Sequence, residues 1–249
     1  NKQDTASAMK NAGAVPFACN TIDIYLHLFY HGIACEKSRT QKGNVSMSEH
    51  VNVCEYIESN CVRVEADCFD IEQIMESGQC FRIYKLSLQE QEKLCKSMGL
   101  ENCESAAWYR VMAADKKVFV CQNGVNLIFF CSKEEYKQFW CHYFDLDFDY
   151  RSYEKAIDAD DNYLKSAFAY GSGIRILNQD PWETLITFII SQRKNIPAIR
   201  QAVEALSKAC GTCIDKENEL YAFPTPTQLS GLSLSDLQDL SLGYRAKYV

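Results

Sequence analysis

Four cationic side chains lie beside predicted helix starts in this 249-residue chain, and their type and position indicate a binding function more directly than those of any other group. Arg193 and Lys194 fall in the turn between two predicted helices, and Arg245 and Lys247 follow Gly243. Backbone N–H groups at the start of a helix attract anions, and a few neighbouring cations strengthen that attraction. The spacing therefore predicts a phosphate-binding surface in the C-terminal part of the chain.

Two other groups of reactive side chains have less specific spacing. Cys210 and Cys213 form a Cys-x-x-Cys pair, but the chain spreads 13 cysteines evenly and offers no second pair to complete four zinc ligands. Residues 145–161 carry seven carboxylates and two cations at a spacing that matches no metal loop. A thiol or zinc protein and a carboxylate metal site stay open as minority interpretations, and we predict no metal and no cofactor.

The distribution of charge along the chain shows which classes of binding partner can be excluded. The chain has a formal net charge of −7, but residues 163–249 carry 9 Lys and Arg against 8 Asp and Glu, a net +1, which leaves 17 − 25 = −8 for residues 1–162. The acidic total therefore does not exclude a nucleic-acid partner for the C-terminal part. A hydrophobic content of 47% with 24% charged residues excludes a wholly disordered, collagen-like or coiled-coil chain.

No targeting or membrane segment is predicted. The most apolar N-terminal stretch, residues 14–34, is interrupted by polar side chains, namely Asn20, Asp23, His27 and His31. The odd number of cysteines does not resemble the disulfide framework of a small secreted domain. We therefore expect a cytoplasmic protein with reduced thiols and no membrane partner.

Residues 60–145 are predicted to form an antiparallel sheet with helices. Apolar and polar residues alternate from Cys61 to Glu65, as in a half-buried strand. Further strands are predicted at 79–86, 108–113, 118–122 and 125–131. Tight turns at 115–117 and 122–124 join the last three, the second with the Asn-Gly hairpin signal. Ser132 caps a predicted helix from Lys133 to about Phe144.

Residues 163–249 are predicted to be all helical. Asp180-Pro181-Trp182-Glu183 is a helix start, followed by a buried stripe of Leu185, Ile186, Ile189 and Ile190. A second helix runs from about Ile196 to Gly211, with a buried face of Ile199, Ala202, Val203 and Leu206. Shorter helices are predicted to begin at 225–228 and 233–236, and Leu242-Gly243 ends the last one.

These patterns predict an α+β fold in two domains, at 60–145 and 163–249. The acidic segment 146–162 is expected to be a plain hydrophilic connector. Residues 1–46 show no sustained period and stay unassigned, either as an untranslated stretch with Met47 as the true start or as a disordered extension. Because the chain begins at Asn1 and stops at Val249 within a patterned segment, we expect a fragment.

Four segments, in this order, resemble the 8-oxoguanine DNA glycosylases, which are DNA glycosylase/AP lyases of the helix-hairpin-helix superfamily. They are residues 69–82, 143–147, 176–183 running into 189–192, and 242–249. The segment 77–82 is the most discriminating, because many relatives share the Asp-Pro-Trp-Glu helix. The resemblance implies a bacterial-type, C-terminally truncated member, with a TBP-like N-terminal domain followed by an incomplete helix-hairpin-helix glycosylase domain.

The resemblance implies a function in base-excision repair. An enzyme of this family flips 8-oxoguanine out of duplex DNA, excises it through a Schiff-base lysine and cuts the strand by β-elimination. Damaged double-stranded DNA is then the partner, and no nucleotide cofactor is needed. We expect a monomer in the bacterial cytoplasm that associates with the nucleoid through DNA.

Gly78 and Phe188 match the residues with which the family recognises the base. Oxidised guanine carries a hydrogen on N7, so a reader of this base must offer an acceptor at close range, and a glycine carbonyl is not obstructed by a side chain. Such a bond contributes about 1–3 kcal/mol of discrimination. Phe188 matches a residue that lines the base pocket. From local pattern alone, Gly78 would be a tight-turn glycine and Phe188 an ordinary core residue.

Tyr244, Arg245 and Arg193 match positions that contact the duplex. Tyr244 corresponds to the wedge that stacks beside the lesion, and Arg245 to a contact with the opposite base. From local pattern alone, they would be an aromatic packed under a helix start and a solvated arginine. Arg193 stands where eukaryotic members have an asparagine that fills the vacated space, and Ala198 stands where they have a second arginine that reads the opposite cytosine.

No catalytic residue is assigned. The family's helix-hairpin-helix, its Schiff-base lysine and its catalytic aspartate lie downstream of the segment that matches 242–249, and neither Lys247 nor another lysine matches that nucleophile. We therefore expect the 249-residue chain to be inactive by itself, and a borohydride-trapped adduct with lesion-containing DNA would contradict this. An alkylated-purine DNA glycosylase, disfavoured by 77–82, and a non-catalytic DNA-binding relative stay open as alternatives.

The alanine at position 198 leads to a prediction on specificity. A bidentate arginine contributes about 1–3 kcal/mol of discrimination between bases. We predict a weaker preference for cytosine opposite the lesion than eukaryotic members show, measured as cleavage ratios across opposite bases. Equal ratios in the two proteins would contradict the prediction.

Overall fold

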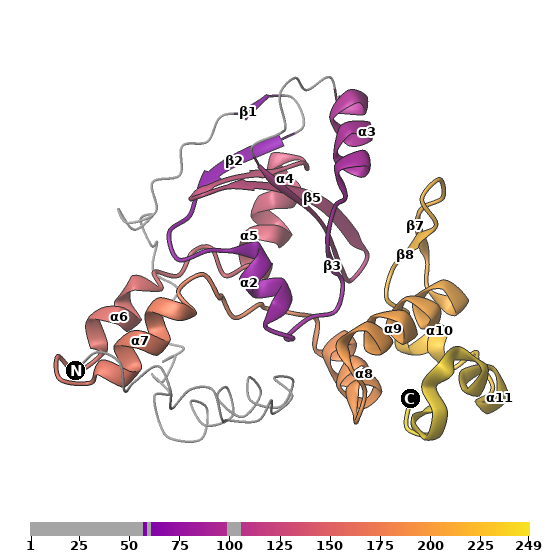
Figure 1. Cartoon of the computed structure of the whole chain (residues 1–249). Coiled ribbons are helices and arrows are strands. Elements are labelled where there is room, and N and C mark those ends of the chain that lie inside the picture. Colours follow the sequence, from indigo (N-terminus) through magenta and orange to yellow (C-terminus); the bar gives the residue numbers. More distant parts are fainter. Residues whose placement is uncertain (1–56, 59–60, 99–105) are drawn as a thin grey trace, which may run out of the picture. The chain divides into compact units, whose positions relative to one another are not determined.

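The computed structural model describes residues 57–58, 61–98 and 106–249 (Figure 1). The two interpretations of residues 1–46 lie outside the described residues. No helix among the described residues is long and apolar enough to span a membrane.

An antiparallel sheet of six strands is the centre of the first part of the described chain (Figure 1). Its order is β1-β2-β6-β5-β4-β3, and every neighbouring pair is antiparallel. The strands are β1 (Ile57–Glu58), β2 (Cys61–Glu65), β3 (Ile83–Lys85), β4 (Ala107–Ala113), β5 (Lys116–Asn123) and β6 (Asn126–Phe129). Tight turns join β4 to β5 and β5 to β6, so local pairing accounts for the centre of the sheet and the predicted α+β fold is confirmed.

Two details of the predicted strands are wrong. The segment expected to be a strand over 79–86 is one only over Ile83–Lys85, because the chain forms a loop at Gly78, whose φ is +77°. Both turns are displaced by one to two residues from their predicted positions. Ala114 and Asp115 form the first, and Gly124, with φ +58°, and Val125 form the second.

Three helical segments cover the sheet on one face, at α4 (Lys133–Glu135), the π-helical turn η1 (Tyr136–Trp140) and α5 (Cys141–Tyr143). Together they match the helix predicted from Lys133, and the Ser132 side chain caps it by accepting from the backbone N–H of Glu135. Aromatic side chains pack from this helix against the sheet, with ring centroids of Phe129 and Phe144 at 5.6 Å. The core therefore joins strand β6 to the helix that follows it. The sheet part also contains α2 (Ile71–Glu76) and α3 (Leu88–Met98).

The acidic segment 146–162 is more structured than expected. It contains α6 (Arg151–Ala156), and α7 (Asn162–Tyr170) begins at its end with Asp161 as the N-cap. Leu146 and Tyr150 are buried. Two apolar side chains of the segment therefore pack into the protein, while its carboxylates stay near the surface, and its role as a connector between domains stays a prediction.

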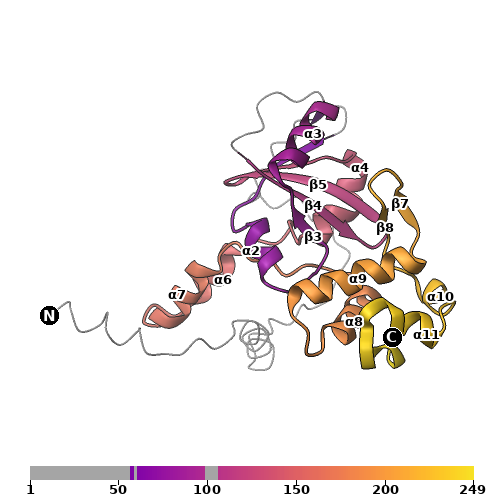
Figure 2. The same cartoon turned by 45° about the vertical axis from the view of Figure 1, so that its right-hand side comes forward.

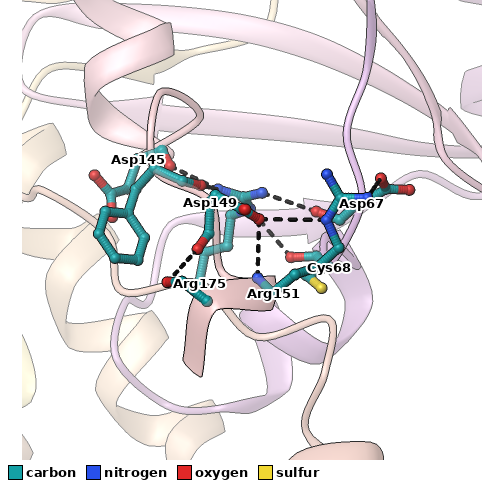
Figure 3. Close-up of polar contacts among 8 residues, drawn as sticks. Asp67, Cys68, Asp145, Asp149, Arg151 and Arg175 are labelled. Carbon is teal, nitrogen blue, oxygen red and sulfur yellow. Dashed lines mark hydrogen bonds and ion pairs between the residues drawn. The ribbon is translucent and has the colours of Figure 1, made fainter. Parts of the chain in front are cut away.

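Arg175 ties the chain around this segment together (Figure 3). Its side chain is 4% exposed, and its guanidinium lies 4.6 Å from the centroid of the Tyr150 ring. It donates four hydrogen bonds of 2.6–3.1 Å to the backbone carbonyls of Asp67, Cys68, Asp145 and Phe148. One side chain therefore joins the segment before α2, the end of the helix after Ser132 and the approach to α8.

The second part of the described chain is built on two long helices, α8 (Pro181–Ser191) and α9 (Ile196–Cys210), which lie side by side (Figure 2). The predicted caps are confirmed, since Asp180, Thr225 and Ser233 each accept from a backbone N–H three residues on, and Asn195, which was not predicted as a cap, does the same for α9. Shorter elements follow, at β7 (Cys213–Asp215), β8 (Leu220–Tyr221), α10 (Pro226–Leu229), α11 (Leu234–Leu237), η2 (Gln238–Leu242) and η3 (Gly243–Lys247).

The buried faces of α8 and α9 largely match the prediction. On α9, Ile199, Ala202, Val203 and Leu206 are all buried, as expected. On α8, Ile186 and Ile190 are buried, but Leu185 is exposed and was wrongly predicted. The hairpin of β7 and β8 was not predicted, because its two strands are only three and two residues long. Among the described cysteines, Cys95 is disulfide-bonded, so the expectation of reduced thiols is wrong for this residue.

Replacing Arg175 by methionine should strongly destabilise the protein. A buried acceptor that loses its donor costs about 1–3 kcal/mol, and Arg175 serves four carbonyls. We expect Arg175→Met to lower the free energy of unfolding by about 3 kcal/mol or more in urea denaturation. The exposed Arg193→Met is the control and should change it by no more than about 0.5 kcal/mol. Equal midpoints for the two variants would contradict this prediction.

Candidate functional site

The loop after α2 presents a glycine in an unusual conformation. Gly78 has a φ of +77°, a region that strains residues with a Cβ, and a Cβ added there would meet nothing within 4 Å. The Ser77 hydroxyl donates to the carbonyl of Ile74 at 2.7 Å and closes the end of the helix. Glycine is therefore favoured by the backbone conformation, and the space beside it is open.

Gln79 bonds this loop to the segment that leads into α8. Its Nε2 donates to the Arg175 carbonyl at 2.9 Å and to the Ser77 hydroxyl at 3.0 Å, and its Oε1 accepts from the Leu177 N–H at 2.9 Å. The Gln79 carbonyl in turn accepts from Nε2 of Gln179 at 2.6 Å. Sequence analysis missed Gln79 and Gln179, since their partners lie about 100 residues away in the chain.

A cleft of about 600 Å³ lies at the start of α8. Its lining is Leu177, Asn178, Gln179, Pro181, Thr184, Leu185 and Phe188. Phe188 is 58% exposed, so the interpretation of this residue as part of the core is wrong. Two lining residues, Leu177 and Gln179, bond to Gln79, and the structure therefore brings the Gly78 loop to the wall of the cleft that contains Phe188.

The turn between α8 and α9 contacts the end of η2 and the residues of η3. Lys194 donates from Nζ to the Ser241 carbonyl at 2.6 Å. Arg245 donates from Nε to the Gln192 carbonyl at 2.8 Å, from Nη2 to the same carbonyl, and from Nη1 to the Leu242 carbonyl at 3.3 Å. The structure thus brings together the two cationic segments singled out from the sequence.

The three residues that were expected to contact the duplex differ in how exposed they are to solvent. Arg193 is exposed, with a φ of +52°, and Tyr244 is 56% exposed. Arg245 is only 6% exposed, and its guanidinium lies 4.5 Å from the centroid of the Tyr244 ring. The interpretation of Arg245 as a solvated residue is therefore wrong, and a base contact would require it to release the Gln192 carbonyl. Its predicted role stays a prediction.

Buried polar contacts connect β3 to α9 and so orient the helices that carry the site. Arg82 donates from Nε and Nη2 to the two carboxylate oxygens of Glu204, at 2.9 and 3.0 Å, and from Nη2 to the Tyr221 carbonyl at 2.6 Å. The Tyr84 hydroxyl donates to the same carboxylate at 2.9 Å. A bidentate arginine–carboxylate pair fixes direction as well as distance, so α9 is held firmly against the sheet.

Glu183 connects α8 to the turn between β4 and β5. One of its carboxylate oxygens accepts from the Ala114 N–H at 3.2 Å. Burial raises the pKa of Glu183 to about 7, and the nearby Arg82 charge opposes that rise only in part. Asp180 performs the capping at this helix start, since its side chain accepts from the Glu183 N–H at 2.8 Å.

The residues considered for metal or thiol chemistry are placed as follows. Cys210 and Cys213 are free thiols, and burial raises the pKa of Cys210. Among the residues that the structure describes, no group of three or more His, Cys, Asp or Glu side chains could hold a metal ion.

The comparisons with known proteins agree with this architecture. A family model described as the N-terminal domain of 8-oxoguanine DNA glycosylase matches residues 61–185. The chain belongs to this family. The match covers strands β2 to β6, the acidic segment, the Gly78 loop and the start of α8.

Individual relatives are similar over different lengths. The N-glycosylase/DNA lyase of Saccharomyces cerevisiae is 41% identical over 80 residues, which cover 31% of this chain and 21% of the yeast protein. The 8-oxoguanine glycosylase/lyase of Clostridium acetobutylicum, in its apo form, is 31% identical with a TM-score of 0.66, over 78% of this chain and 62% of that one. The same enzyme bound to double-stranded DNA with cytosine opposite 8-oxoguanine gives a TM-score of 0.65 at 31% identity, over 78% and 61%.

Glu183 should make the stability of the protein depend on pH. The unfolded carboxyl ionises above about 4.5, whereas the folded one stays protonated to about 7, so the free energy of unfolding should fall as the pH rises between these values. We expect a fall of up to about 3 kcal/mol, measured by urea denaturation from pH 4 to pH 8. Glu183→Gln should remove this fall and be more stable than the unmodified chain at pH 8, with the exposed Glu134→Gln as the control. A fall of equal size in Glu183→Gln would contradict the assignment.

Proposed function

We propose that this chain recognises 8-oxoguanine in double-stranded DNA as part of a base-excision repair DNA glycosylase/AP lyase. The observation that carries the proposal is the Gly78 loop, which is bonded to the wall of a cleft containing the exposed Phe188. Two relatives named above are glycosylase/lyases, and one of them is bound to DNA containing 8-oxoguanine. The chain spans about a fifth of the yeast relative and about three-fifths of the Clostridium enzyme.

Base recognition would use a backbone group and an aromatic side chain. The carbonyl at Gly78 would accept from the N7 hydrogen that oxidised guanine carries and guanine lacks. Guanine would instead place its N7, an acceptor, against the carbonyl oxygen of Gly78, which is also an acceptor. Both atoms would then lack a hydrogen-bond partner once the base has left water. Phe188 would contact the face of the extruded base.

The duplex would lie against the turn between α8 and α9. Tyr244 would fill the space left by the base, and Arg193 would contact the opposite strand or base. The first N–H groups of the 15-residue helix α9 add a partial positive charge beside the turn. A few well-placed donors would then suffice to bind the DNA phosphates, although the chain has a net negative charge.

The domain assignment belongs to the same proposal. Residues 60–145 would form the N-terminal domain of the glycosylase, 146–162 the connection and 163–249 the beginning of the helical domain. We propose that the protein acts as a monomer in the bacterial cytoplasm. No described residue is assigned to the chemical step, in which a Schiff-base lysine would expel the base.

A binding experiment with Gly78→Ala tests the proposal. The unmodified chain should bind a duplex with one 8-oxoguanine opposite cytosine about 5- to 150-fold more tightly than the guanine duplex, as fluorescence anisotropy would measure. Gly78→Ala should lose most of this ratio, because a methyl group beside the carbonyl obstructs the base. The fold itself has room for the methyl group, so the substitution should lower the free energy of unfolding by only about 1 kcal/mol.

Gly124→Ala is the matched control. Gly124 also has a positive φ, at +58°, and also has nothing within 4 Å of an added Cβ. This variant should lose similar stability and keep the lesion preference. Equal binding of the two duplexes by the unmodified chain would contradict the proposed function, and an unchanged ratio in Gly78→Ala would contradict the role of Gly78. Tighter binding of a duplex with an alkylated purine would favour the alternative glycosylase.

A further inference from the structure

We propose that Gln79 is a positioning residue, which holds the Gly78 carbonyl at the cleft wall and so determines how well the protein separates 8-oxoguanine from guanine. The expected effect of Gln79 on the choice between the two bases rests on the function proposed above. Its consequence for the loop can be measured in the free protein.

Gly78 cannot fix its own orientation. It has no side chain, nothing lies within 4 Å of where a Cβ would stand, and within the described part of the chain it makes no hydrogen bond of its own. Glycine also has the widest choice of backbone conformations. The direction of its carbonyl is therefore set by the residues on either side, Ser77 and Gln79.

Gln79 is bonded at every polar group of its side chain. The two hydrogens on Nε2 serve the Arg175 carbonyl and the Ser77 hydroxyl, and Oε1 accepts from the Leu177 N–H, all at 2.9–3.0 Å. A planar amide with one acceptor and two donors matches this set of partners. Glutamate at this position would keep the acceptor and lose both donors, and methionine would keep the length and lose all three bonds.

The hydrogen bonds of Gln79 connect it to the wall of the cleft. Leu177 and Gln179 line the cleft, and Gln179 donates to the Gln79 carbonyl at 2.6 Å. Gln79, the residue after Gly78, is thereby joined to the cleft wall by its backbone carbonyl and by its side chain. This arrangement sets the separation between the Gly78 carbonyl and the side of α8 where Phe188 lies.

The experiment compares Gln79→Met with Gln122→Met. Gln122 is a matched control, because its side chain also makes three hydrogen bonds, with the Ile71 N–H and with the carbonyls of Phe69 and Gly124, all at 2.9 Å. These bonds hold the other end of α2. The two substitutions should therefore lower the stability by similar amounts while only one of them frees the Gly78 loop.

The first measurement is the backbone mobility of the loop in the free protein, from ¹⁵N relaxation. In Gln79→Met, the order parameters of the N–H groups of Gly78 and Gln79 should fall below about 0.6, and in Gln122→Met they should stay near those of the unmodified chain. Gln79→Glu, which keeps one of the three side-chain bonds, is the second variant and serves if Gln79→Met does not fold. Unchanged order parameters at Gly78 in the folded Gln79 variants would overturn the proposal.

The second measurement is the ratio of affinities for the 8-oxoguanine and guanine duplexes. Gln79→Met should reduce the ratio about as far as Gly78→Ala does, and Gln122→Met should keep the ratio of the unmodified chain. A ratio that survives in Gln79→Met would overturn the role of Gln79 while leaving the proposed function intact. If the unmodified chain has no lesion preference, the proposed function fails and with it the role of Gln79 in selectivity, and the order parameters alone then decide whether Gln79 holds the loop.

Discussion

The buried guanidinium of Arg175 binds four backbone carbonyls from two distant stretches of chain, and the path of the chain into the site depends on it. It has no carboxylate among these four partners, so its charge is compensated by carbonyl dipoles and by the face of Tyr150. Its own carbonyl accepts from Gln79, and the residues that follow it become the wall of the cleft. The same residue thus organises the fold and leads into the site.

Arginines in this protein serve two different purposes. Arg82, Arg175 and Arg245 are buried, and each donates to carbonyls or a carboxylate of the protein itself. Arg193 is exposed at the turn between α8 and α9. Counting cations would therefore overstate the charge available to a phosphate backbone. The proposed interface depends on geometry, with a helix N-terminus and one exposed arginine beside an exposed tyrosine, and less on net charge.

A glycine carbonyl as the reader of a base places an unusual demand on the surrounding structure. A side chain that recognises a ligand is held by its own rotamer and packing, whereas the direction of a backbone carbonyl depends on the neighbouring residues. In the proposed site, the Ser77 hydroxyl and the Gln79 amide would provide that support, through their bonds to the helix end and to the segment before α8. The exposed apolar side chains of Leu185 and Phe188 line the same cleft.

The sequence by itself determined the elements whose causes are local. Asp180 and Thr225 cap the helices they were predicted to begin, and β4, β5 and β6 pair through tight turns, because these signals act within a few residues. Only the tertiary structure decided which face of α8 is exposed, that Arg245 is buried, and that the Gln79 side chain bonds to Arg175 and Leu177. Each of these depends on contacts between residues roughly 50 to 100 positions apart, such as Arg245 with Gln192 and Gln79 with Arg175. A periodic pattern shows that a residue is apolar or polar, but burial and hydrogen-bond partners are set by which surfaces meet when the chain folds.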